Sequence, residues 1–138
     1  TGIPAGTKMI VVMLEGVSTN GTVSIQIQLG DSGGIEDATY ISGGLRASGG
    51  AVAGPTDSTT GFIIINAAAT RVWHGSYIFT LKDATNFTWV GHGVIYSTDG
   101  VELNFSSGSK SLSAELTQIS VFSGTNSFDA GSISISYM

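Results

Sequence analysis

The chain has no cysteine, only two prolines and few charged side chains among its 138 residues. The absence of cysteine excludes disulfides, thiolate metal sites and cysteine nucleophiles. Charged residues make up 11% of the chain, compared with about 25% in an average soluble domain. A protein that binds polyanions needs clustered Lys and Arg, whereas the five basic residues here are scattered. The composition therefore argues against nucleic acid and anionic membrane surfaces as partners.

Long apolar runs are also missing. The longest one, residues 9–14, is far shorter than the roughly 20 residues of a membrane-spanning helix, so we expect no insertion into a membrane. The length fits one domain, residues 1–138. Because the sequence begins with Thr1 and not with Met, we expect this domain to be a fragment of a longer chain.

Period-two alternation of apolar and polar residues runs along nearly the whole chain, and sustained helical periodicity is absent. Each alternating segment indicates a strand with one dry and one wet face. In residues 101–106, for example, Val101, Leu103 and Phe105 are predicted to face the core. About eight strands are predicted, over residues 7–16, 22–30, 61–66, 71–82, 87–97, 101–106, 110–123 and 131–138.

Turn residues suggest how these strands connect. Asn20-Gly21 and Asp99-Gly100 are typical of tight hairpin turns, and residues 83–86 are predicted to form a four-residue hairpin loop. A change of phase within residues 110–123 predicts a β-bulge near Thr117-Gln118. Hairpin-linked strands in this number favour an all-β fold, an antiparallel β-sandwich of jelly-roll type.

Two predicted strands, residues 9–14 and 62–65, are apolar on both faces. Either a loop of the same chain covers the second face, or that face packs against another subunit, as in obligate interfaces. Residues 42–60, rich in glycine, match neither a strand nor a tight turn. A long loop of this kind in a compact domain is usually functional or disordered.

Motifs that carry catalysis are mostly not found. The sequence has no phosphate-binding loop, and most aspartates lie in predicted turns, where they hydrogen-bond locally. The only histidines are His74 and His92. A four-residue loop at 83–86 would place them on opposite faces, and a loop one residue longer or shorter would place both on one face, still too far apart to chelate. We therefore expect no enzymatic activity, no cofactor and no metal site within one chain, although three copies of His92 can meet an ion on a threefold axis.

Aromatic residues are the remaining candidates for a ligand site. They gather on two neighbouring strands: Trp73, Tyr77, Phe79, Phe87 and Trp89. Such a group either fills the core or forms a platform on which sugar rings stack. Arg46, in the predicted long loop, offers a planar donor to a polar ligand. The candidate binding residues are Arg46, Trp73, Trp89 and His92.

Both ends of the sequence carry a recognisable pattern. Its pieces are Ile3-Pro4, residues 9–14 followed by E-G-V-S-T-N-G (15–21), I-Q-L-G (27–30), L-T-Q-I-S-V (116–121) and F-D-A-G-S-I-S-I-S-Y (128–137). This pattern resembles the C-terminal receptor-binding (tip) domain of bacteriophage tail fibre proteins. The match covers about the first 30 and the last 25 residues, and residues 31–100 resemble the family only loosely. The matching positions are strand and turn residues, so no binding residue is carried over.

The resemblance implies a homotrimer at the extracellular tip of a tail fibre of the virion, in contact with bacterial surface polysaccharide or an outer-membrane protein. We therefore expect a non-enzymatic host-recognition module. A structural trimerisation or capping domain is the main alternative, and a free-standing carbohydrate-binding module is weaker. A polysaccharide depolymerase tip is less expected, because such tailspikes resemble long β-helices with carboxylate pairs and this chain shows no repeat.

Overall fold

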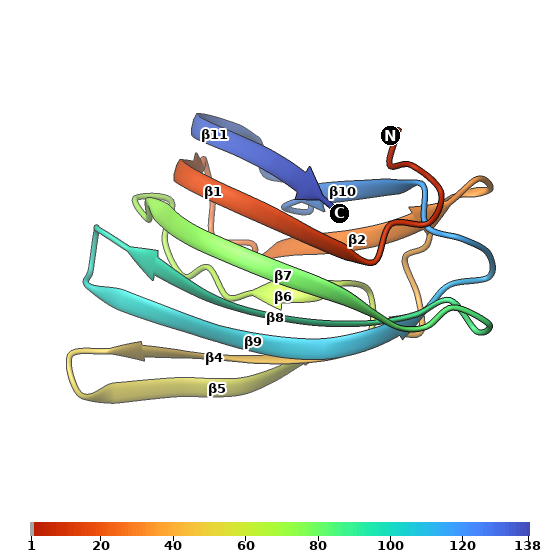
Figure 1. Cartoon of the computed structure of the whole chain (residues 1–138). Helices are drawn as coiled ribbons and strands as arrows, with labels where there is room; N and C mark the ends of the chain where they lie inside the picture. The colour runs from red at the N-terminus through yellow and green to blue at the C-terminus, as the bar shows by residue number, and fades with distance from the viewer. Residues whose placement is uncertain (1) are drawn as a thin grey trace.

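The computed structural model describes residues 2–138, which form eleven strands and no helix (Figure 1). Within this described part, no helix is long and apolar enough to cross a membrane. The strands are β1 (Met9–Thr19), β2 (Ile25–Asp31), β3 (Gly34–Ile35), β4 (Ile41–Ser48), β5 (Ala51–Ser58), β6 (Phe62–Ile64), β7 (Trp73–Asp83), β8 (Thr88–Ser97), β9 (Glu102–Ser111), β10 (Gln118–Phe122) and β11 (Phe128–Tyr137).

The strands form two antiparallel sheets. The larger sheet has seven strands in the order β11-β1-β7-β8-β9-β4-β5. The smaller one has the order β10-β2-β3, and β6 also pairs with β2. The predicted all-β, antiparallel class is confirmed, whereas the predicted number of strands is too low.

The core lies between the two sheets, and β2 follows the alternation of the sequence. In β2, Ile25, Ile27 and Leu29 are fully buried. The aromatic residues of β7 form the centre, where the Tyr77 and Phe79 rings stack at 4.9 Å. Alternation therefore identifies the buried face of β2, and the aromatic residues of β7 fill the core and do not form a platform.

Residues 42–60 form a hairpin, so the predicted loop is wrong. β4 and β5 pair along most of their length, and the turn between them uses Gly49 and Gly50 with φ angles of 55° and 85°. The register shifts between Gly44 and Arg46, where two residues of β5 oppose one of β4. The strand signal is weak because small residues dominate both strands and because β5 is an exposed edge strand.

The predicted bulge near Thr117-Gln118 is also wrong. The segment 110–123 is not one strand, because β9 ends at Ser111 and β10 begins at Gln118 in the other sheet. Leu112 and Leu116, on the connection, are both buried in the core. The change of phase in the sequence therefore marks a change of sheet.

The predicted turns have mixed outcomes. Asp99-Gly100 does connect the hairpin β8–β9, and Gly100 has a φ of 86°. Asn20-Gly21 instead links β1 of the larger sheet to β2 of the smaller one, so that hairpin prediction is wrong. In the β7–β8 hairpin, His74 pairs with Tyr96, one residue away from the predicted register.

β6 shows how a strand can be apolar on both faces within a single chain. Phe62, Ile63 and Ile64 are all buried, because β6 pairs with β2 on one side and lies against the inner face of the larger sheet. Side chains satisfy its other edge: Asn104 accepts from Ile65 N at 2.9 Å and donates to Ile65 O at 2.7 Å. The same chain therefore covers β6, whereas the outward-facing Met13 of β1 stays exposed.

The predicted faces of β9 are reversed. Glu102, Asn104 and Ser106 are buried, and Leu103 and Phe105 are each 39% exposed. The reversal is tolerated because each inward polar side chain has a hydrogen-bond partner on another strand or loop. An apolar strip consequently lies on the outer face of the larger sheet.

β1 and β11 bulge at the same point. Their register shifts between Glu15 and Ser18, and Gly16 and Gly131 have φ angles of 65° and 86°. A Cβ atom on Gly131 would lie 2.3 Å from the carbonyl carbon of Gly16. The two backbones can approach this closely only because residue 131 is glycine.

Candidate functional site

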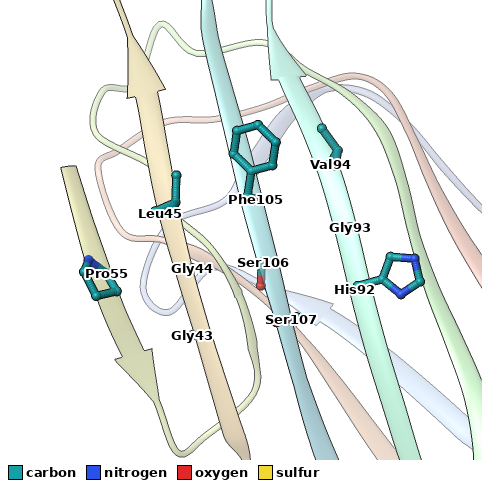
Figure 2. Close-up of a pocket in the computed structure, with 10 residues that line it drawn as sticks. All are labelled: Gly43, Gly44, Leu45, Pro55, His92, Gly93, Val94, Phe105, Ser106 and Ser107. Atoms are coloured by element: carbon teal, nitrogen blue, oxygen red, sulfur yellow. The ribbon is translucent and has the colours of Figure 1, made fainter. Parts of the chain in front are cut away.

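A shallow groove of about 470 Å³ crosses the outer face of the larger sheet, over β5, β4, β9 and β8 (Figure 2). Register places Leu45, Phe105 and Val94 side by side on adjacent strands. These three side chains form an apolar row along the groove. Pro55 of β5 lies at one end and His92 of β8 at the other.

The groove exists because the next row of residues is short. Gly43 pairs with Ser107, and Ser107 pairs with His92. Neither Gly43 nor Ser107 fills the space beside the Phe105 ring, so that one face of the sheet is hollowed there. The small residues that leave this hollow are also the reason why β4 is difficult to recognise as a strand in the sequence.

No lining residue carries a formal charge when His92 is neutral. Exposed polar groups come from the His92 imidazole and the Ser107 hydroxyl. Ser106 is turned inward, with its hydroxyl 3.1 Å from the hydroxyl of Tyr77. Burial raises the pKa of Tyr77, so this phenol stays protonated and structural.

A buried ion-pair network holds one end of the groove strands. Glu102, only 2% exposed, lies 2.8 Å from Arg46 of β4 and 2.6 Å from Arg71 of the segment before β7. Arg71 also reaches Asp99 in the β8–β9 turn at 3.2 Å. The network ties β4, β9 and this turn together, which fixes the relative positions of the strands that carry the groove.

A second buried charge lies near the other end of β9. The ammonium of Lys110 contacts the Glu36 carboxylate at 2.6 Å and donates to Ala38 O and Thr39 Oγ1, both at 2.9 Å. Burial raises the pKa of Glu36, but Lys110 and hydrogen bonds from Ser113 together lower it more, so the net pKa lies below its usual value. All three ammonium protons have partners, and this lysine therefore anchors the 36–40 segment and has no free donor.

The four candidate residues from the sequence are not brought together. Only His92 lines the groove. Trp73 and Trp89 are 0% and 2% exposed in the core, which does not fit a stacking platform. Arg46 faces inward to Glu102, so its guanidinium has a structural partner.

The histidines do share one face, as the alternative loop length predicts. His74 and Ile78, the partner of His92, are both on the outward side of β7. The His74 ring accepts a hydrogen bond from Gly16 N at 3.3 Å. Among residues 2–138, no cluster of three or more potential ligands could hold a metal ion.

Sequence reasoning missed Phe105, Val94 and Leu45. Phe105 was assigned to the core by its alternation with Asn104, and Leu45 was placed in a loop. No local signal could have found Phe105, because Glu102 and Asn104 alternate with the apolar residues as ordinary solvent-facing residues do.

The groove can bind a flat, mostly uncharged ligand, with the exposed Phe105 ring as the stacking surface and His92 and Ser107 as hydrogen-bonding groups. Protein interfaces and sugar sites both use aromatic residues in this way. No protein-family model, no curated protein and no solved structure matches this chain. Functional inference therefore rests on the sequence and on the geometry of the molecule.

Proposed function

We propose that this chain is a non-enzymatic host-recognition module at the tip of a bacteriophage tail fibre. It binds a bacterial surface glycan or outer-membrane receptor during adsorption, from the extracellular face of the virion. The proposal includes a jelly-roll-type sandwich and a homotrimer, both of which the resemblance implies.

One observation carries this proposal: the segments that resemble the fibre family pair with one another. The pieces at 9–21 and 128–137 contain β1 and β11, which are neighbours, and the pieces at 27–30 and 116–121 lie on β2 and β10, also neighbours. The groove is built by β4, β5, β8 and β9, mostly from the part that resembles the family only loosely. A shared frame with a variable binding surface is what a host-recognition domain needs.

The chemistry of the groove supports a neutral ligand over a charged one. Phe105 offers a ring face and no charged side chain lines the floor. One such shallow site binds weakly. Three linked copies raise the avidity by roughly 10² to 10⁴ over a single contact when the spacing allows simultaneous binding.

A binding assay on bacteria tests the proposal. Fluorescently labelled protein is incubated with a panel of bacterial strains, and strains that bind the wild type are tested with Phe105→Ser and His92→Ala. We expect each variant to bind at least about tenfold more weakly, equivalent to about 1.4 kcal/mol. Val52→Ser is the matched control, since Val52 is an exposed apolar residue outside the groove.

The alternatives give different results. A structural capping domain would not bind to the cells of any strain, and the groove variants would show the same lack of binding as the wild type. A depolymerase tip would release reducing sugar from host capsule, whereas we expect no release.

A further inference from the structure

At the end of the larger sheet away from the groove, the outer edge of β11 is unpaired within residues 2–138. β11 is the last strand of the larger sheet and pairs only with β1. Its inward-facing residues Ile133, Ile135 and Tyr137 pair with Leu14, Val12 and Ile10, which are buried. Even so, these three β11 side chains are 36%, 41% and 47% exposed.

These side chains are exposed because the smaller sheet is too narrow to cover them. It ends on this side with β10, which pairs only with β2 (Figure 1). Ile119 and Val121 of β10 pack against the core, and Phe122 is exposed. An apolar stripe, defined here as Ile133, Ile135 and Tyr137, therefore faces solvent beyond the end of the smaller sheet.

The two edges of the larger sheet differ in how they are protected. The β5 edge carries Pro55 next to a bulge and ends near Asp57, features that prevent the addition of another strand. β11 has no proline, and its single charge, Asp129, is hydrogen-bonded by the Ser18 hydroxyl. A long unprotected edge beside an apolar stripe is a surface for association.

We infer that β11 is the contact between copies of this chain, and that the apolar stripes of three copies face one another around a threefold axis. The inference rests on the homotrimer in the proposed function and adds the surface that forms it. A second copy fits this stripe because identical apolar stripes complement one another, and the only charged residue of β11, Asp129, lies outside the stripe, so that no like charges meet at the contact.

The geometry of a strand suits this arrangement. Residues of the stripe are two apart, so they recur about every 6.7 Å along β11. Three strands that run along one axis would stack Ile133, Ile135 and Tyr137 in successive layers. Ten residues of β11 are fewer than the roughly 20–30 residues per side of a standard interface, so each pairwise contact is weak and closure of the ring stabilises the assembly.

Single cysteines test this arrangement cleanly, because the chain has none of its own. Solution mass of the wild type at tens of micromolar is expected to equal three chains. Oxidised Ile135→Cys is expected to give covalent dimers with about one third of the thiols still free, since the third chain of a trimer has no partner left. Val94→Cys, an exposed position in the groove, is the matched control and should not cross-link.

A charge in the stripe gives an independent readout. Ile135→Asp is expected to shift the mass to one chain and to keep the far-ultraviolet circular dichroism of the wild type, because Ile135 is already exposed within one chain. If the wild type is a trimer but Ile135→Asp stays trimeric and Ile135→Cys fails to cross-link, the β11 contact is refuted and the proposed function stands. Complete loss of free thiols in a two-chain species would refute the threefold arrangement, and a wild type that is monomeric throughout would refute both this contact and the proposed trimer.

Discussion

Asn104 provides the sharpest test of how the two sheets are joined. Its side-chain amide replaces a neighbouring strand along the free edge of β6, with hydrogen bonds of 2.9 and 2.7 Å to the backbone of Ile65. Asn104→Ala removes both partners at once. The Ile65 N–H and C=O would then have no protein partner beside the core.

The expected loss follows from these two bonds. A buried backbone group without a partner costs about 1–3 kcal/mol. Ile65 is half-buried, so that water partly compensates, and the sum for both groups is about 3 kcal/mol. For a domain of this size, that corresponds to a decrease in Tm of roughly 10 °C.

Urea denaturation and thermal melting of the monomeric background Ile135→Asp would measure this loss without a contribution from assembly. Asn86→Ala is the matched control, because Asn86 is exposed and hydrogen-bonds Asp83 within one turn; its loss should stay below about 1 kcal/mol. An Asn104→Ala variant as stable as that control would refute the role of Asn104 as a strand substitute.

Three further predictions concern charge and backbone packing. The pKa of Glu36 is below its usual 4.5, so the stability that this carboxylate contributes is complete above that pH and is lost as the pH falls through the lowered pKa. Lys110→Met should therefore make the free energy of unfolding, measured by urea denaturation between about pH 3 and 7, less dependent on pH. An unchanged pH dependence would contradict this. Gly131→Ala forces a Cβ into the Gly16 backbone at a φ of 86°, so we expect a loss of at least about 1–2 kcal/mol, with amide exchange in β11 increasing first. Glu102→Ala leaves two arginines without their buried partner. The free energy of unfolding should decrease by about 3 kcal/mol, which is at the lower end for a broken buried pair because both arginines are partly exposed. A decrease below about 1 kcal/mol would count against the network.

Local patterns in the sequence predict the elements of this fold that obey local rules. The alternation in residues 25–29 identifies a buried face, and Asp99-Gly100 identifies a hairpin, because each depends on residues that are close in the chain. The reversal of β9 depends on partners far away: Glu102 needs Arg46, and Asn104 needs Ile65. A single sequence does not show which distant residues will meet.

The candidate site was difficult to predict for the same reason. Only His92 was identified, because the chain has just two histidines and because Gly91 and Gly93 on either side of His92 are unusual within a strand. Phe105 becomes a surface residue only when β9 is reversed, and Leu45 becomes its neighbour only when the glycine-rich segment forms β4. Trp73 and Trp89 carried the strongest aromatic signal and are in the core, where a central strand pair needs large side chains.

The pairing of β1 with β11 has a consequence for the order in which the molecule can form. β1 contains residues 9–19 and β11 contains residues 128–137, so more than a hundred residues separate two strands that lie side by side. On a ribosome, β1 gains this neighbour only after β11 has emerged. Until then its outer edge is open, and such long-range pairing makes folding slow. A chain that stops before residue 128 would leave β1 as the new edge of the sheet, with Ile10, Val12 and Leu14 beside it, and aggregation would be its expected fate.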